Sequence, residues 1–463
     1  MLINGALIAS ETKFEVVNPA TEEVIAHAPH CTRAQLDSAV EAAARVFNSW
    51  RLNEARRRHA LTTIAMLVRA HADELAALLS SEQGKPVQFA LREINSVANE
   101  FQQAASQEIP VQVLLDDATA RCEIRRVPLG VTALITPWNY PLNTAAVKMA
   151  PALLIGNTVI FKPSPNTPLA ALRFAEIVRD AVPAGVINVV TGTNELGPWI
   201  TCHPGIKKIS FTGSVATGKN IMASCAGNLT RVTLELGGND AALVLEDADI
   251  QTTAEKLTSS AFYNAGQVCV AVKRVYVHRG IHDALTEACA RIAREIRLGS
   301  GADPEAQMGP LNNRAQLDRV SFLVEDARQR GATILAGGSR VVRPGYFYAP
   351  TIVTHIKDGV PLVDEEQFGP VLPFIIFDDV EDAIDKANRS SFGLAGSVWT
   401  NDIVRGTAVA ARLECGRTGV NVHAGTPVLS PFGGFKSSGI GREHGIWGLD
   451  AMSEIQVLTT MRK

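Results

Sequence analysis

Short apolar runs rich in β-branched residues, alternating with helical patterns, constrain the fold of this chain more than any other feature. In its first half these runs cover residues 131–135, 158–161, 186–190, 207–211, 232–236 and 241–245. Helical spacing of apolar residues lies between some of them, at 169–180 and 195–202. Strands that are apolar throughout and alternate with helices are typical of a parallel sheet covered on both faces. We therefore predict an α/β fold in which a ligand binds beyond the carboxyl ends of these strands.

A second series of strands and helices follows residue 269. Its predicted strands cover residues 274–278, 372–377 and 396–400, and its predicted helices cover residues 281–296, 313–330 and 379–388. Two such series in one chain predict two parallel-sheet α/β domains.

The N-terminal region has a different pattern. Thr32 and Gln35 have the spacing of a capping box, and the apolar positions after them predict a helix that runs to about residue 48. Similar spacing predicts one long helix over 54–82. Charged and apolar residues alternate loosely over 111–126, which indicates a two-stranded β ribbon that projects towards a partner.

Composition excludes several classes of protein. The chain is 46% hydrophobic and 20% charged with a formal net charge of −3, so no basic field is available to hold a nucleic acid or an anionic membrane. No apolar run reaches the ~18 residues of a membrane span, and the N-terminus lacks the pattern of a secretory signal, so we expect a cytoplasmic protein. The seven cysteines are scattered without a C-x-x-C pair, which predicts free thiols and no structural metal site.

Cys269 is the candidate nucleophile among these cysteines. It ends the segment 262–269, which contains glycine and side-chain amides, and the other six cysteines have no comparable setting. A free thiol has a pKa near ~8.5, so a nucleophilic cysteine needs a polar, electropositive or basic environment. The alternative is a buried and inert thiol.

Polar residues follow several predicted strands at the edge where a ligand would bind. Glu235 stands at the end of an otherwise apolar strand, where burial would raise its pKa towards the range of a general base. Its alternative role is to pair with Arg231 or Lys273. Asn139 has the amide of an oxyanion donor and could also be an ordinary turn residue. Lys162 provides a cation at the same edge, or is a solvated loop lysine.

One glycine-rich turn invites a comparison with phosphate-binding loops. Residues 213–219 match G-x-x-x-x-G-K, but Asn220 replaces the Ser or Thr that binds magnesium, which argues against a nucleoside triphosphatase. The usual G-x-G-x-x-G fingerprint of dinucleotide binding is also absent from the sequence. A Gly-Ser turn between a strand and a helix could still bind a phosphate through its N–H groups, or be only a tight turn.

Taken together, these motifs resemble the NAD(P)-dependent aldehyde dehydrogenases of the hydrolytic type. The resemblance covers nearly the whole chain and rests on residues 18–21, 137–139, 162–164, 211–214, 234–238, 266–269, 365–370 and 431–436. It implies a cofactor-binding domain made of residues 1–107, 127–237 and 438–452. It also implies a catalytic domain of residues 238–437 and a small β oligomerisation arm of residues 108–126 and 453–463.

The resemblance also implies roles for individual residues. Cys269 would attack the aldehyde to give a thiohemiacetal, with the oxyanion held by the Asn139 amide and the Cys269 backbone N–H. Hydride would then pass to the nicotinamide, and Glu235 would activate the water that hydrolyses the thioester to a carboxylic acid. The implied cofactor contacts are Thr136, Pro137, Trp138, Lys162, Ser164, Gly213, Ser214, Gly237, Glu366 and Phe368. The implied partners are a small aldehyde and further copies of the chain, as a dimer or tetramer.

Some residues depart from the family pattern. Pro165 stands where strongly NAD-selective members commonly have Glu, so we expect NAD or NADP to be accepted. Gly419 replaces a common Trp, and Asn143, Thr144 and Val147 replace bulkier residues, which predicts a wider and more polar mouth of the aldehyde channel. Two rival functions are a CoA-acylating semialdehyde dehydrogenase, which typically lacks the hydrolytic Glu, and a non-catalytic structural relative.

Overall fold

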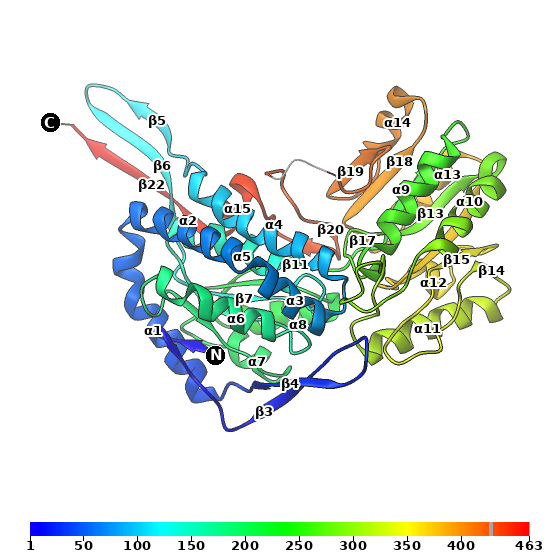
Figure 1. The fold of residues 1–463 in the computed structure, drawn as a ribbon. Coiled ribbons are helices and arrows are strands. Elements are labelled where there is room, and N and C mark those ends of the chain that lie inside the picture. The colour runs from blue at the N-terminus through cyan, green and yellow to red at the C-terminus, as the bar shows by residue number, and fades with distance from the viewer. Residues whose placement is uncertain (426–428, 463) are drawn as a thin grey trace.

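A central parallel sheet organises the first half of the molecule (Figure 1), in a computed structural model that describes residues 1–425 and 429–462. In spatial order its strands are β2 (Ala6–Leu7), β1 (Leu2–Ile3), β9 (Ile187–Val189), β8 (Thr158–Lys162), β7 (Val131–Ile135), β10 (Lys208–Thr212), β11 (Arg231–Glu235) and β21 (Gly439–Ile440). The strands from β9 to β11 are parallel, and antiparallel pairs close both edges. The apolar runs of the sequence thus form the predicted sheet.

Helices cover both faces of this sheet. They are α1 (Arg33–Arg51), α2 (Glu54–Ala70), α3 (Ala72–Gln83), α4 (Val87–Ser106), α5 (Pro141–Ile155), α6 (Leu169–Val178), α7 (Leu196–Thr201) and α8 (Val215–Ala226). Side chains alternate between two apolar clusters, so that Leu134 packs on one face while Ala133 and Ile135 pack on the other. The capping box at Thr32 and Gln35 is confirmed, because each side chain accepts the backbone N–H of the other residue.

The prediction of one helix over 54–82 is wrong, because the chain breaks at His71 between α2 and α3. His71 has φ −114° and ψ 21°, outside the helical region, and its Nδ1 lies 2.9 Å from the carbonyl oxygen of Leu67. Asp73 and Glu74 then occupy the first turn of α3, where acidic side chains complement the free N–H groups. The apolar spacing continues across the break and conceals it.

The second half contains another sheet. Its strands, in spatial order, are β14 (Thr333–Ala336), β15 (Thr351–Thr354), β16 (Val371–Phe377), β13 (Val272–His278), β12 (Asp240–Val244), β18 (Ala395–Trp399) and β19 (Arg417–Val420). All neighbouring pairs except β14 with β15 are parallel. The sequence predicted β12 as part of the first series, and this is wrong: the chain crosses to the second sheet at Gly237 and Gly238, and β12 pairs with β13 and β18.

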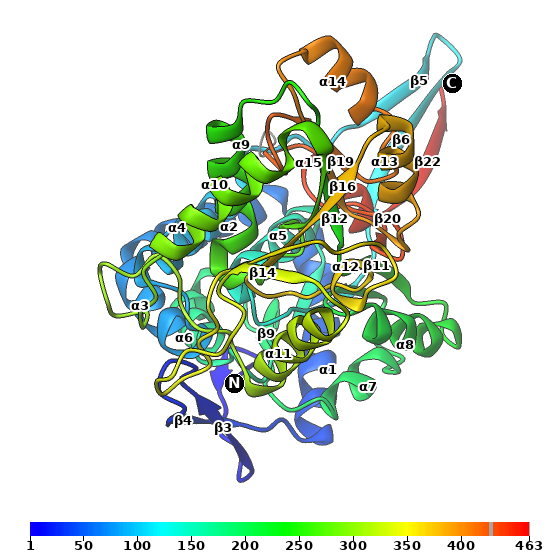
Figure 2. The same ribbon diagram turned by 90° about the vertical axis from the view of Figure 1, so that its right-hand side faces the viewer.

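Helices of the second half also lie on both sides of their sheet. They are α9 (Ile250–Phe262), α10 (His282–Glu295), α11 (Arg314–Gln329), α12 (Pro361–Asp364), α13 (Val380–Asn388) and α14 (Ile403–Ala410). Figure 2 shows α9 and α10 on one side of β12 and β16, and α13 on the other. A separate apolar core fills this half.

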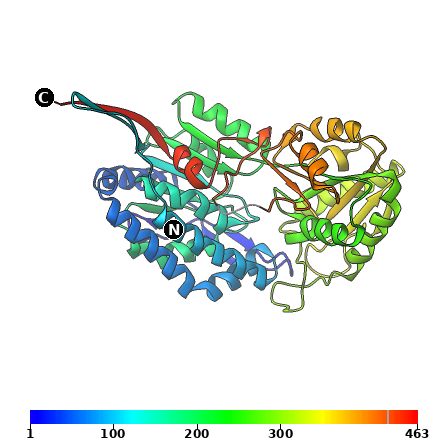
Figure 3. The same cartoon turned by 90° about the horizontal axis from the view of Figure 1, so that it is seen from above.

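A three-stranded antiparallel sheet projects from the first half, away from the second (Figure 3). It contains β5 (Gln112–Asp116), β6 (Ala120–Pro128) and β22 (Ser453–Met461), so the predicted ribbon is confirmed and the C-terminal strand extends it. The remaining elements are the β3 (Lys13–Val17) and β4 (Val24–Pro29) hairpin, β17 (Phe392–Gly393) with β20 (Phe435–Lys436), and α15 (Gly445–Ala451). Within residues 1–425 and 429–462, no helix is long and apolar enough to cross a bilayer.

Candidate active site

The register of the first sheet brings the ends of four strands together. Ile135 at the end of β7 pairs with Lys162 at the end of β8, and Thr212 at the end of β10 pairs with Glu235 at the end of β11. The loops after β7, β10 and β11 open into one cavity of about 950 Å³. Of the residues predicted for the site, those that line this cavity are Pro137, Trp138, Asn139, Gly213, Ser214, Glu235, Gly237, Cys269, Glu366 and Phe368.

Three predicted cofactor residues lie outside the lining of this cavity. Thr136, Lys162 and Ser164 are buried at the same edge of the sheet. The ammonium of Lys162 donates to the carbonyl oxygen of Pro163 at 3.3 Å, and burial lowers its pKa to about 8. Lys162 is therefore not a solvated loop lysine, and its contact with a cofactor stays a prediction.

Left-handed backbone conformation shapes the loop that carries Cys269. Asn264, Ala265 and Gly266 have φ values of 52°, 55° and 72°. A Cβ on Gly266 would lie 2.2 Å from the carbonyl oxygen of Gly369, so only glycine fits there. Strained backbone of this kind persists where the surrounding structure fixes it, and it is common at functional sites.

The side chain of Lys273 also fixes the loop that carries Cys269. Its ammonium donates to the carbonyl oxygens of Val268 at 2.7 Å and Cys269 at 3.1 Å. Burial raises the pKa of the Cys269 thiol to about 12, and the positive charge of Lys273 opposes this rise. The resting thiol is therefore protonated at neutral pH, and it needs a base nearby before it can act as a nucleophile.

Asn139 is fixed through its side-chain amide and through its backbone carbonyl. Its Nδ2 donates to the carbonyl oxygen of Gln267 at 2.9 Å, which leaves the second N–H of the amide free for another acceptor. Its own carbonyl oxygen accepts hydrogen bonds from the Lys85 ammonium at 2.8 Å and from Asn264 at 3.2 Å. These contacts exceed what an ordinary turn residue makes, and they suit a preorganised oxyanion donor.

Glu235 is a buried carboxylate without a partner. It is 2% exposed, and within the described part of the chain neither of its oxygens has a hydrogen-bond partner. The alternative of pairing with Arg231 or Lys273 is wrong, because Arg231 pairs with Glu454 at 2.8 Å and the Lys273 ammonium bonds the Cys269 loop. Burial raises the pKa of Glu235 well above its ordinary value.

A buried ion pair lies beside Glu235. Lys148 in α5 pairs with Glu443, and both side chains are buried. The negative charge of Glu443 raises the pKa of Glu235 further, whereas the ammonium of Lys148 lowers it. The protonation of Glu235 therefore responds to a neighbouring charged pair as well as to burial.

Glu366 and Phe368 face the first half of the molecule across the cavity. The backbone N–H of Gly238 donates to Glu366 at 3.0 Å, and a Cβ on Gly237 would lie 2.3 Å from a carboxylate oxygen of Glu366. Phe368 packs edge to face against Trp138, with ring centroids 5.5 Å apart. The predicted residues of the two halves therefore meet in one place.

The family model for aldehyde dehydrogenases matches residues 7–458. The chain belongs to the aldehyde dehydrogenase family. It is 38% identical to the mitochondrial aldehyde dehydrogenase of Leishmania tarentolae, over 98% of this chain and 93% of that protein. It is 36% identical to the putative aldehyde dehydrogenase DhaS of Bacillus subtilis strain 168, over 98% of this chain and 94% of that protein.

Solved structures agree with this assignment. An NAD+ complex of aldehyde dehydrogenase from Bacillus cereus superposes with a TM-score of 0.97 at 38% identity, over 100% of this chain and 96% of that one. An E. coli NADP dependent enzyme superposes with a TM-score of 0.96 at 36% identity, over 99% and 97%. The predicted α/β fold class and the predicted aldehyde dehydrogenase family are confirmed.

Gly419 is one of the positions where this aldehyde dehydrogenase departs from the family pattern. A Cβ on Gly419 would lie 2.3 Å from the carbonyl oxygen of Val422, so backbone occupies the space that a larger side chain would fill. A larger side chain does not fit at Gly419 with this backbone, and the predicted width of the channel mouth stays a prediction. Asn143, Thr144 and Val147 line the cavity as expected.

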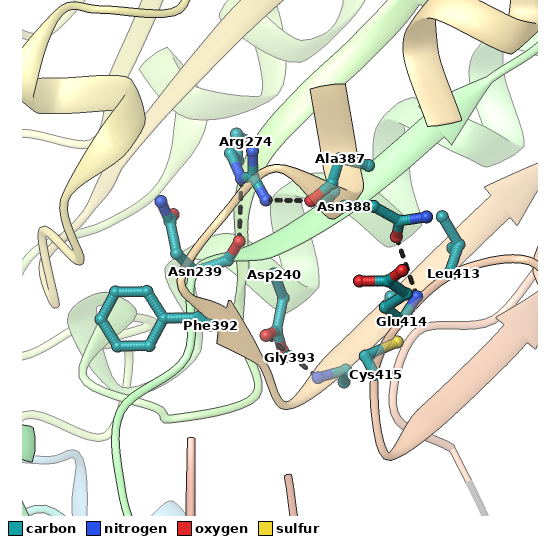
Figure 4. A pocket seen from close by; sticks show the side chains of 13 residues that line it. Asn239, Asp240, Arg274, Ala387, Asn388, Phe392, Gly393, Leu413, Glu414 and Cys415 are labelled. Atoms are coloured by element: carbon teal, nitrogen blue, oxygen red, sulfur yellow. Dashed lines mark hydrogen bonds between the residues drawn. The ribbon is translucent and has the colours of Figure 1, made fainter. Parts of the chain in front are cut away.

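A much smaller cavity lies in the second half of the molecule, lined by residues that include Asn239, Asp240 and Arg274 (Figure 4). Its volume of about 20 Å³ has room for one water molecule. The guanidinium of Arg274 donates to the carbonyl oxygens of Asn239 at 2.8 Å and Ala387 at 2.9 Å. This cavity is therefore too small for a substrate, and its hydrogen bonds fix the segment that follows Gly238.

Sequence reasoning missed two buried ion pairs of this aldehyde dehydrogenase. They are Lys85 with Glu93, beside Asn139, and Lys148 with Glu443, beside Glu235. Lys148 gave one signal, since it is a lysine within an otherwise apolar helix, where a charge requires a partner. The partners themselves are distant in sequence, so no local pattern indicates them.

Proposed function

We propose that this protein oxidises an aldehyde to a carboxylic acid with NAD or NADP, through a covalent intermediate on Cys269. The observation that carries the proposal is the unpaired, buried carboxylate of Glu235, which lines the same cavity as Cys269 and Asn139. A nucleophile, an oxyanion donor and a base of raised pKa in one cavity suit acyl transfer to water.

The residues present fit a nicotinamide dinucleotide. Ser214 caps the N-terminus of α8 and lines the cavity, where N–H groups and the helix dipole favour a phosphate. Because Gly237 has no side chain, the Glu366 carboxylate can approach the backbone at this position. Gly237, Glu366 and Trp138 all line the cavity. Bacillus cereus aldehyde dehydrogenase in complex with NAD+ and the E. coli NADP dependent enzyme support use of either dinucleotide. When bound, the nicotinamide accepts the hydride released by the substrate.

Cys269 starts the reaction by attacking the carbonyl carbon of the aldehyde through its sulfur. The thiol proton is released to solvent as the C–S bond forms. The carbonyl oxygen becomes an oxyanion, which accepts hydrogen bonds from the free N–H of the Asn139 amide and from the Cys269 backbone. Loss of hydride from the carbon converts the thiohemiacetal into a thioester.

Glu235 then completes the reaction. Its deprotonated form takes a proton from water, and the resulting hydroxide attacks the thioester carbon. The C–S bond breaks to release the carboxylic acid and the Cys269 thiolate, to which Glu235 returns the proton, so that both residues regain their starting state. Burial keeps the pKa of Glu235 high, which makes its carboxylate a stronger base than an exposed one. A CoA-acylating enzyme needs no such base, so Glu235 favours the hydrolytic reaction.

The decisive experiment measures NAD(P)H formation with a panel of aldehydes and both dinucleotides. Glu235→Gln is the sharpest variant, because it should give one rapid burst of NAD(P)H followed by a slow steady state. Equal loss of the burst and the steady state would assign Glu235 to an earlier step. No NAD(P)H with any aldehyde would favour the non-catalytic alternative.

The projecting sheet of β5, β6 and β22 supports an oligomerisation role. Its exposed apolar side chains include Val113 at 44%, Ile455 at 66% and Val457 at 59% exposure, and apolar surface of this kind is typical of an interface. We assign residues 108–126 and 453–463 to this arm, residues 238–437 to catalysis and the rest to cofactor binding. Ile455→Lys should lower the molar mass measured by light scattering, and an unchanged mass would refute the assignment.

A further inference from the structure

Among the described residues, Arg417 lines the catalytic cavity without a carboxylate partner. The arginines of the lining are Arg319 and Arg417, and Arg319 pairs with Glu365 at 3.0 Å. Within the described residues, the Arg417 guanidinium bonds only backbone, at 3.4 Å to the carbonyl oxygen of Pro431 and 3.3 Å to that of Ser430. A guanidinium has five N–H donors, so most of its capacity is unused.

Arg417 lies at the end of the cavity where the chemistry takes place. Arg417, Cys269 and Glu235 line the same cavity; burial lowers the pKa of Arg417, and Cys269 and Glu235, when ionised, raise it. Its guanidinium carbon lies 4.8 Å from the centroid of the Phe432 ring, which also lines the cavity. Arg319 instead lies beside Glu366, at the proposed cofactor end.

The acidic residues around the cavity do not neutralise Arg417. Glu443 pairs with Lys148, and Glu366 accepts the N–H of Gly238. Within the described part of the chain, the oxygens of Glu235 have no hydrogen-bond partner, so Glu235 forms no ion pair with Arg417. The guanidinium of Arg417 therefore keeps free N–H donors and a positive charge for an anionic ligand in the cavity.

We propose that Arg417 binds an anionic group of the substrate, so that the preferred substrates are aldehydes with a carboxylate at the opposite end of a short carbon chain. This inference rests on the proposed aldehyde oxidation. The planar guanidinium binds a carboxylate through two parallel hydrogen bonds, and the half-buried position of Arg417 strengthens them. The aldehyde end of the same molecule then reaches Cys269.

Paired substrates test this specificity. 4-Oxobutanoate, 5-oxopentanoate and 6-oxohexanoate are compared with butanal, pentanal and hexanal as neutral partners of matched length. Arg417→Met should lower the ratio of kcat/KM for each carboxylate-bearing aldehyde to kcat/KM for its matched alkanal by about 10- to 100-fold, the effect of one charged hydrogen-bonded contact. Arg417→Lys should retain part of the preference, because it keeps the charge without the planar fork.

A matched control removes a neighbouring positive charge. Arg442 also acts on Glu235, but its guanidinium bonds the carbonyl oxygens of Gly434 and Gly441 and does not line the cavity. Arg442→Met should leave the ratio between the two substrate classes unchanged. Equal losses for both classes in Arg417→Met, or no preference for the carboxylate in the wild type at any length, would refute the inference.

A binding measurement separates this inference from the proposed reaction. Succinate and glutarate, as non-reactive dicarboxylates, should slow alkylation of Cys269 by iodoacetamide in the wild type and not in Arg417→Met, whereas butyramide should protect neither. Protection that depends on Arg417, in a protein that oxidises no aldehyde, would support the anion site and refute the reaction. Equal protection in both proteins would refute the anion site. Similar melting temperatures of the variants confirm that each is folded.

Discussion

The buried ion pair of Lys85 and Glu93 controls the position of the proposed oxyanion donor. Both side chains are 1% exposed, and the ammonium lies 2.6 Å from the carboxylate and 2.8 Å from the carbonyl oxygen of Asn139. The other oxygen of Glu93 accepts the backbone N–H groups of Leu142 and Asn143, each at 3.2 Å. The Lys85–Glu93 pair therefore fixes this loop at two points, the carbonyl of Asn139 and the first turn of α5.

Lys85→Met should destabilise the protein strongly. It leaves the Glu93 carboxylate buried without its cation, which costs about 3–5 kcal/mol of the free energy of unfolding. Adding Glu93→Gln removes this charge while its side-chain oxygen still accepts an N–H of α5, so the double variant should recover about 2 kcal/mol. Urea denaturation followed by tryptophan fluorescence measures both values.

Turnover separates positioning from stability in the same variants. Both lack the hydrogen bond from Lys85 to Asn139, so kcat should be lowered by about 10-fold or more in the single and the double variant, even where stability returns. Arg173→Met provides the control, because its pair with Glu74 is exposed and should contribute less than about 1 kcal/mol with no change in kcat. Recovery of kcat together with stability in the double variant would refute a positioning role.

Four further substitutions test the proposed mechanism and the use of the dinucleotide. Cys269→Ser should bind dinucleotide normally by fluorescence titration but lose nearly all oxidation, since a hydroxyl is the poorer nucleophile; near-normal turnover would contradict the assignment. Glu235 acts when deprotonated and Lys148 lowers its pKa, so Lys148→Met should move the rising limb of the kcat–pH profile to higher pH, and Glu443→Gln should move it lower. Pro165→Glu should reduce kcat/KM with NADP much more than with NAD, because a carboxylate repels the 2′-phosphate; unchanged NADP efficiency would place the ribose elsewhere.

The sequence predicted the parts of the fold that rest on local pattern. Apolar β-branched runs predicted the central strands. Because Asn139 and Glu235 both follow or end such strands, they were predicted to lie at the same edge of the sheet. Both side chains line the same cavity as Cys269, which comes from the other half of the chain. The rule that the carboxyl ends of parallel strands meet at one edge of a sheet was sufficient to predict that Asn139 and Glu235 lie at the same site.

Contacts between distant segments were not predictable in the same way. Lys148 and Glu443 are 295 positions apart, so neither residue indicates its partner by spacing. Short or partly exposed strands such as β14 and β19 also lack the apolar continuity that marks a central strand. Arg417 lies on β19, and its relation to the catalytic cavity depends on how the two halves pack.

The unpaired carboxylate of Glu235 has a consequence for stability that links function to pH. Its folded pKa lies well above the unfolded value of about 4.3, so the native state binds the proton more tightly and stability falls as pH rises through this window. Glu235→Gln removes the buried charge, because the amide is neutral at every pH. The variant should therefore exceed the wild type in melting temperature at pH 8 and by less at pH 5. The same difference at both pH values would mean that Glu235 finds a partner in solution, and would remove the reason to regard it as a base held ready for catalysis.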